Sequence, residues 1–204
     1  MIENKLPLYL VDPNFLSKEE VGPIVREIEE LPWHVNMGIG AAEDGLVGIA
    51  GDEFLDRFIV ASEPLPGDPD HRLWPIARSM AQRFCDAHNL ELGEIFRTRV
   101  NLTCYSSDPR PLPPHLDLRN KHKHYILIVF FNESDGDTIM YDLTYDGEYH
   151  TQEDLHEIKR FSPTLGGAAL MSGDYFHAWE RPKHHDFRLT LIVNMEVTVK
   201  PEQQ

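Results

Sequence analysis

The amino-acid sequence predicts a mainly β, α+β fold: a double-stranded β-helix (jelly roll) preceded by two buttressing helices. From Glu94 onwards the hydrophobic residues recur at every second position, which is typical of strands. Turn-forming runs rich in Gly, Pro, Ser and Asp divide this part into eight short segments, as in a jelly roll. The sequence contains no internal repeat and no linker. We therefore expect one domain over 1–204, with a helical and loop part at 1–93 and a jelly-roll catalytic core at 94–197.

The N-terminal part begins with a short alternating strand over 8–11. Ser17 lies three residues before Glu20, which is the spacing of a helix capping box, and apolar residues then recur at helical spacing to about Glu30. A second amphipathic helix is expected over 73–89. Each helix has one apolar face, so both are expected to cover a face of the sheet.

The glycine-containing segment 33–51 separates these helices. Its glycines suit a hairpin and loop that need positive φ angles. Long loops of this kind also serve as lids, so a flap over a pocket is the functional alternative.

The strands of the core are predicted from the alternation and from the turns between them. We expect them at 96–105, 115–118, 125–132, 138–142, 157–161, 168–171, 176–180 and 187–197.

A His and an Asp two residues apart mark the most informative site in this core. On an extended segment the side chains of His115 and Asp117 face the same way, and a second His would complete the two-His, one-carboxylate triad of non-haem Fe(II) oxygenases. His184 and Asp186 have the same spacing, but no His follows Asp186. His177 does follow Asp117, on a later strand. We therefore select His115, Asp117 and His177 as metal ligands and catalytic residues.

Arg188 stands in an apolar strand, ten residues beyond His177 when the intervening residues are counted. An Arg in such a run usually faces solvent. Alternatively it points inward together with Thr190, which lies on the same face two residues later. A buried guanidinium needs an anion, and its planar fork matches a carboxylate.

Other metal-binding residue types are weaker signals. His122 and His124 have a His-x-His spacing seen in cupins, but the rest of a cupin motif is out of register, and a solvated strand end is the preferred interpretation. Cys85 and Cys104 lie among apolar residues and are expected to be buried, reduced thiols.

The order His115-Leu116-Asp117, His177, Arg188 on a C-terminal jelly roll resembles the Fe(II)/2-oxoglutarate-dependent dioxygenases. The prolyl-hydroxylase-like branch is the most similar. Tyr105, ten residues before His115, is similar to a Tyr of that branch. Segments 128–132 and 135–138 look like its third core strand ending in Asn and its Gly-containing turn. The resemblance covers about 94–197.

This resemblance implies Fe(II), O2 and the cosubstrate 2-oxoglutarate, with ascorbate as a further candidate cofactor. It implies that Arg188 binds the distal carboxylate of 2-oxoglutarate, that Tyr105 hydrogen-bonds the cosubstrate, and that the reaction is a hydroxylation coupled to decarboxylation to succinate. Thr190 could add a hydroxyl bond. Prolyl hydroxylases often have a Tyr on the third core strand, where this chain has Val129 and Phe130; either Thr190 or Tyr125 would take its place.

The net charge and the composition restrict the classes of molecule that this protein is expected to bind. With 19 basic and 34 acidic residues the net charge is −15, which disfavours nucleic acid. Neither a signal peptide nor a membrane span is indicated, so a cytoplasmic location is expected. We expect a small-molecule or peptidyl substrate, with a prolyl side chain as the first candidate. The alternatives are a non-catalytic jelly-roll binding module, with Arg188 facing solvent, and a cupin-type metalloenzyme that does not use 2-oxoglutarate.

Overall fold

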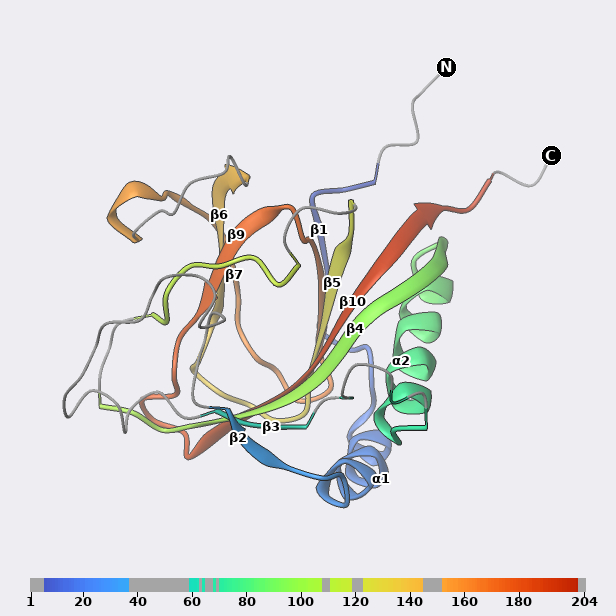
Figure 1. The fold of residues 1–204 in the computed structure, drawn as a ribbon, viewed down its shortest axis with the longest axis horizontal. Helices are drawn as coiled ribbons and strands as arrows, with labels where there is room; N and C mark the ends of the chain where they lie inside the picture. The colour runs from blue at the N-terminus through green and yellow to red at the C-terminus, as the bar shows by residue number, and fades with distance from the viewer. Residues whose placement is uncertain are drawn as a thin grey trace.

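Ten β-strands and two α-helices form the part of the chain that the computed structural model describes, namely residues 6–36, 59–62, 64, 68, 70–107, 111–118, 123–144 and 152–201. The strands form two antiparallel sheets that face each other, and both helices lie on the outer side of the larger sheet (Figure 1). The predicted fold class, a double-stranded β-helix with N-terminal helices, is confirmed. No helix in the described ranges is long and apolar enough to cross a lipid bilayer.

The larger sheet has seven strands and the smaller sheet has three. The order in the larger sheet is β1 (Tyr9–Asp12), β8 (Ala168–Ser172), β5 (Tyr125–Phe130), β10 (Phe187–Val199), β4 (Leu90–Cys104), β3 (Ile59–Ser62) and β2 (His34–Asn36). The order in the smaller sheet is β7 (Glu157–Phe161), β6 (Thr138–Thr144) and β9 (Tyr175–Trp179), with a short 3-10 helix at Gln152–Asp154 before β7.

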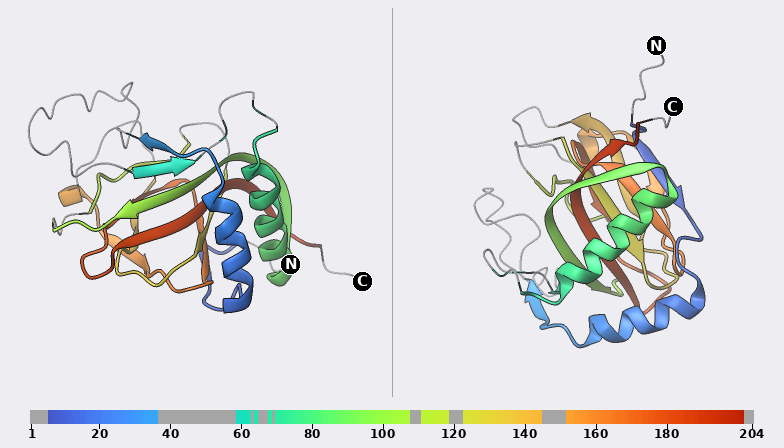
Figure 2. Two further views of the ribbon diagram at one scale, coloured as in Figure 1. Left: turned by 90° about the horizontal axis from the view of Figure 1, so that it is seen from below. Right: turned by 90° about the vertical axis from the view of Figure 1, so that its right-hand side faces the viewer.

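The helices α1 (Lys18–Glu29) and α2 (Leu73–Ala87) cover one face of the larger sheet (Figure 2). Their apolar faces bury Ile28 and Phe84 against alternate residues of β10, including Leu191. At the start of α1 the Ser17 amide donates to the Glu20 carboxylate over 2.8 Å, as the capping-box spacing predicts. Glu20 also accepts hydrogen bonds from Arg83 of α2 and so joins the two helices.

The space between the two sheets holds an apolar cluster and, beside it, a set of buried polar side chains. Ile128, Phe130, Met140 and Phe161 belong to a buried cluster there. The residues of β10 that alternate with its helix-facing ones point into this interior, because successive side chains of a strand face opposite sides. They include a polar set, Arg188, Thr190 and Asn194, all of them buried.

Several element predictions differ from the structure. Residues 115–118 do not form a strand; only His115 pairs, in an isolated bridge with His177. Pro113 and Pro114 precede it and have no N–H, so a continuous ladder cannot form there. β4 begins at Leu90 and pairs with β10 past register shifts after Asn194.

The 33–51 segment is seen only in part. Its first residues form β2, which pairs antiparallel with β3. β3 lies beyond residue 51 and was not predicted, so a hairpin within 33–51 stays a prediction. The flap prediction rests mostly on residues 37–51, which lie outside the described residues.

Candidate active site

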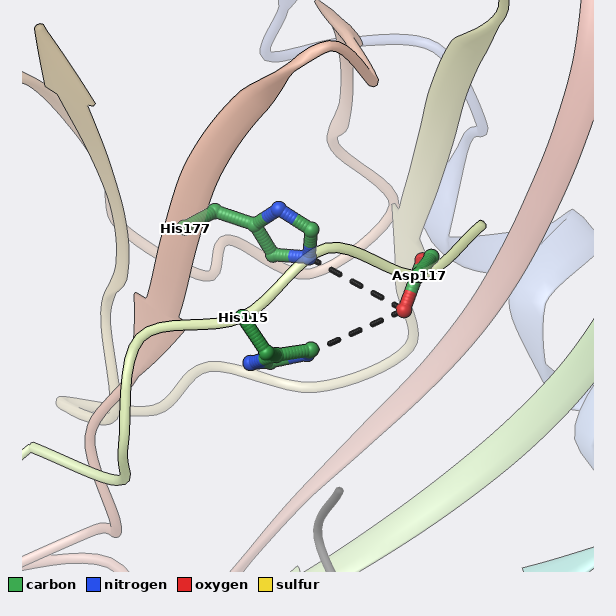
Figure 3. Close-up of side chains that lie close together, drawn as sticks. All are labelled: His115, Asp117 and His177. Carbon is green, nitrogen blue, oxygen red and sulfur yellow. Dashed lines mark ion pairs between the residues drawn. The ribbon is translucent and has the colours of Figure 1, made fainter. Parts of the chain in front are cut away.

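His115 and His177 are brought together by one antiparallel pairing of backbone. Each backbone amide donates to the carbonyl of the other residue, over 2.9 and 3.0 Å. In such a hydrogen-bonded pair the two side chains lie on the same face of the sheet. The imidazole centroids are accordingly 4.5 Å apart (Figure 3). A strand residue and a loop residue 62 positions apart therefore become neighbours through two hydrogen bonds.

Asp117 completes the group. Its Oδ1 lies 3.7 Å from Nε2 of His115 and 3.8 Å from Nε2 of His177, and all three side chains point to a common centre (Figure 3). The three ligand atoms lie within 4.8 Å of one another, and no other such group occurs among the described residues. This is the spacing that ligands of one metal ion require.

Both imidazoles have the tautomer that a metal ligand needs. Nδ1 of His115 lies 3.1 Å from the Pro113 carbonyl oxygen, and Nδ1 of His177 lies 3.3 Å from that of Tyr175. A carbonyl only accepts, so each Nδ1 carries a proton, and Nε2 is the ring nitrogen left to bind a metal. Burial, with repulsion from His177, lowers the pKa of His115 to about 3, which keeps this imidazole neutral at physiological pH.

The Asp117 carboxylate is oriented by the larger sheet. Nδ2 of Asn194 donates to Oδ2 over 3.0 Å, and Nη1 of Arg97 lies 3.5 Å from Oδ1. Asn194 and Arg97 are cross-strand partners on β10 and β4. Burial alone would raise the pKa of Asp117, but His177, Arg97 and His115 together hold it well below its usual value. Asp117 is therefore a carboxylate, the form that binds a cation.

Arg188 faces the interior and not solvent; it is 2% exposed. Its Nη2 donates to Oγ1 of Thr138 over 2.6 Å, and its guanidinium carbon lies 5.8 Å from the centroid of the Phe130 ring. Burial lowers the pKa of Arg188 to about 10, opposed by the charge of Asp137, so the group is still cationic at neutral pH. Within the described part of the chain no carboxylate forms an ion pair with it. This geometry contradicts the solvent-facing Arg188 that a binding module would have.

Buried polar atoms without partners surround Arg188. They are its own Nε, Oγ1 of Thr190, and, on β4, Oδ1 of Asn101 and Oγ1 of Thr103. Thr190 pairs with Asn101, and Arg188 pairs with Thr103, so these groups share the interior face of two neighbouring strands. Native proteins seldom leave buried polar groups unpaired, and such a set indicates a place for a polar ligand.

The two tyrosines considered for cosubstrate binding lie in different places. Tyr105 follows the last residue of β4 and is 55% exposed, and its bond to the cosubstrate stays a prediction. The hydroxyl of Tyr125 donates to the Pro7 carbonyl over 3.1 Å, at the end of β5 remote from Arg188. Between the two suggested replacements for the missing tyrosine, Thr190 lies beside Arg188 and Tyr125 does not.

Two weaker signals are corrected. His124 is buried at 2% exposure and not solvated, because it packs beneath Gly173; His122 lies outside the described residues. Cys85 is a buried thiol as expected, whereas Cys104 is exposed at the end of β4.

Sequence reasoning missed several residues of the site, including Arg97, Asn194, Trp179 and Thr138. Asn194 lies an even number of positions after Arg188, so the alternation that selected Thr190 also places it on the interior face. Trp179 is two residues after His177 and shares its face by the same rule. No sequence pattern indicated Thr138, because it lies on β6 of the smaller sheet and contacts Arg188 on β10 of the larger sheet.

Comparison with solved structures identifies this architecture. A 2-oxoglutarate–Fe(II) oxygenase-family protein from Burkholderia pseudomallei superposes with a TM-score of 0.61 at 14% identity, over 93% of this chain and 85% of that one. The α-ketoglutarate-dependent carbocyclase SnoK of nogalamycin biosynthesis gives 0.63 at 13% identity, over 97% and 83%. The chain has the fold of the 2-oxoglutarate-dependent Fe(II) oxygenases.

The prolyl-hydroxylase branch is represented among these matches. A Trichoplax adhaerens prolyl hydroxylase, in complex with a hypoxia-inducible-factor peptide fragment, gives a TM-score of 0.54 at 12% identity, over 92% of this chain and 82% of that one. No protein-family model matches the sequence, and no curated protein matches it. At such low identities the likeness is one of fold alone.

Proposed function

We propose that this protein is an Fe(II)- and 2-oxoglutarate-dependent oxygenase, a hydroxylase that couples oxidation of its substrate to decarboxylation of 2-oxoglutarate to succinate. The observation that carries the proposal is the meeting of His115, Asp117 and His177 at one point inside a jelly roll. Two imidazoles and one carboxylate form the facial triad that leaves three metal positions open.

The donor set fits Fe(II). Both Nε2 atoms are fixed by hydrogen bonds at Nδ1. The Asn194 amide engages Oδ2 of Asp117, so Oδ1 faces the imidazoles as a single-oxygen ligand. Groups that fix the orientation of metal ligands in this way increase the affinity of a site for its metal.

The residues around Arg188 fit a dicarboxylate. Arg188 supplies a buried cation with Nε unpaired, and Thr190 supplies a hydroxyl without a partner. A carboxylate of 2-oxoglutarate would satisfy both, while the opposite end of the cosubstrate reaches the metal. When bound, Fe(II) would activate O2, and the oxidative decarboxylation of 2-oxoglutarate would supply two of the electrons, so that O2 could hydroxylate a substrate C–H bond. The role of Tyr105 and the use of ascorbate stay predictions from the family resemblance.

The first experiment tests the metal site. Under anaerobic conditions Fe(II) and then 2-oxoglutarate are added, and the visible charge-transfer absorption is recorded. We expect a band for the wild type and none for His115→Ala, Asp117→Ala or His177→Ala, because each loses one of three protein ligands. His184→Ala, on an exposed loop, is the matched control and should keep the band. A normal band and normal turnover in His177→Ala would contradict the proposal.

The substrate is proposed to be an amino-acid or peptidyl group, with a prolyl side chain tested first. Succinate formation by the Fe(II) protein would be compared for free proline, proline-rich peptides and other free amino acids. Stimulation by one of these classes supports the substrate assignment. Stimulation by none would contradict it without affecting the charge-transfer result, which tests the oxygenase chemistry separately.

A further inference from the structure

The three tryptophans of the chain differ in what their indole N–H groups contact. Nε1 of Trp33 donates to the Ile28 carbonyl over 3.2 Å, and Nε1 of Trp74 donates to the Asp68 carbonyl over 3.0 Å. Nε1 of Trp179 is buried and has no partner, although the residue is 93% buried. A buried donor left unpaired loses its hydrogen bond to water without replacement, so it is rare unless a ligand completes it.

Trp179 lies between the proposed metal site and Arg188. Its ring meets that of His115 edge to face, with centroids 4.9 Å apart. On its other side it is the cross-strand partner of Thr138, whose hydroxyl accepts the hydrogen bond from Arg188. The indole therefore forms part of the wall along which a ligand would extend from the metal to the guanidinium.

We propose that the Trp179 indole N–H donates a hydrogen bond to the carboxylate that Arg188 binds, and so helps to select a dicarboxylic cosubstrate. The inference rests on the proposed function. Among the described residues, the unpaired donors on this side are the Arg188 guanidinium, the hydroxyls of Thr190 and Thr103, and the indole. The indole alone of these also adjoins the metal-site residue His115. The position is the second after the metal ligand His177, on the same face of β9.

The test compares two ligands that differ only at the distal end. 2-Oxoglutarate and 2-oxobutanoate have the same 2-oxo acid group for the metal, but 2-oxobutanoate lacks the distal carboxylate. Their dissociation constants would be measured by calorimetry with Ni(II)-loaded protein, which binds without turnover. Trp179→Phe keeps an aromatic ring and removes the N–H together with part of the indole, as Trp74→Phe does at the control position. Trp74→Phe, on α2, removes an indole N–H that is bonded to a backbone carbonyl and serves as the control.

We expect Trp179→Phe to weaken 2-oxoglutarate binding roughly 10- to 100-fold, the size for a hydrogen bond to a charged group. Binding of 2-oxobutanoate and of Ni(II) should stay unchanged, and Trp74→Phe should alter neither ligand. Equal weakening of both ligands, or no weakening of either, would overturn the assignment of Trp179.

Arg188→Ala separates this proposal from the proposed function. In that variant the preference for 2-oxoglutarate over 2-oxobutanoate should disappear. If the wild type itself shows no preference, the carboxylate site and the Trp179 contact both fail. If the wild type shows it and Trp179→Phe keeps it in full, only the Trp179 contact is wrong.

A second measurement needs no change at Trp179. The Trp33→Phe, Trp74→Phe double variant has Trp179 as its sole indole. Its fluorescence should change on adding 2-oxoglutarate and not on adding 2-oxobutanoate. The same response to both ligands would contradict a contact at the distal carboxylate.

Discussion

At the scale of single residues, the geometry of Asp117 explains how one carboxylate is presented to a metal. Its Oδ2 is bonded to Asn194, and its Oδ1 faces the Nε2 atoms of His115 and His177. Because Asn194 stands on β10 and Asp117 on a loop, this hydrogen bond also fixes the loop against the larger sheet. The orientation of the metal ligand thus depends on a neutral side chain that binds no metal itself.

Asn194→Leu, which keeps the volume and removes the donor, should lower metal affinity about 10- to 100-fold, as for other outer-shell changes at metal sites. Anaerobic titration with Fe(II) measures this. The matched control is Thr98→Val, which removes a buried hydroxyl that bonds to the Ile192 carbonyl on β10, and should leave metal affinity unchanged. An unaltered Fe(II) affinity in Asn194→Leu would show that Asn194 does not position Asp117 for the metal.

Contacts between side chains of the site were predictable from the sequence only where the spacing of two residues implied that they lie close together. The two-residue offset predicted that His115 and Asp117 would meet, and they do, although residues 115–118 form no strand. Arg188 and Thr190 share a face of β10, as their offset predicted. The Asn194 contact depends on which loop crosses β10, and the Thr138 contact depends on how two sheets stack. Neither is encoded in a local pattern.

At the scale of elements, β10 serves both sides of the molecule. Its interior face carries Arg188, Thr190 and Asn194, and its other face packs against the helices through Leu191 and its alternate neighbours. Because its side chains alternate between an apolar and a polar face, β10 contributes both to the hydrophobic core and to the candidate site. This is why the helices, though remote from the triad, support it.

Leu191→Ala should lower the free energy of unfolding by about 2–5 kcal/mol, because it removes a fully buried side chain and leaves a cavity between the sheet and the helices. Urea denaturation of the metal-free protein measures this. Ile158→Ala, at an exposed position of β7, is the control and should change stability by less than about 0.5 kcal/mol. Equal effects of the two substitutions would contradict the burial of β10.

Element boundaries were predicted well where alternation was uninterrupted. The expected strand at 157–161 is the observed β7, and the others mostly differ by one or two residues. The failures have local causes. Pro114 leaves the segment around His115 without a ladder, and the register shifts after Asn194 let β4 extend back to Leu90. The short strand β3 was missed because it forms only by pairing with β4 and β2.

At the scale of the whole molecule, an acidic chain encloses a buried cation. The net charge is −15, yet Arg188 is 2% exposed and forms no ion pair with a carboxylate among the described residues. A small dianion can be attracted by this guanidinium once inside, because the field of a buried charge acts at short range in a low dielectric. A polyanion must stay outside, where the acidic surface repels it.

We therefore predict that methylated single-stranded oligonucleotides neither bind this protein nor stimulate its formation of succinate. Nucleic-acid binding gains most of its free energy by releasing counterions to Lys and Arg contacts, and a surface of net charge −15 offers few such contacts. Fluorescence anisotropy of a labelled oligonucleotide, measured at about 50 mM salt where such binding is strongest, should show no saturation at micromolar protein. A matched uncharged peptide would serve as the control for nonspecific adsorption. Tight binding that weakens steeply as salt is raised, together with succinate released by the oligonucleotide alone, would mean that a local basic surface outweighs the net charge.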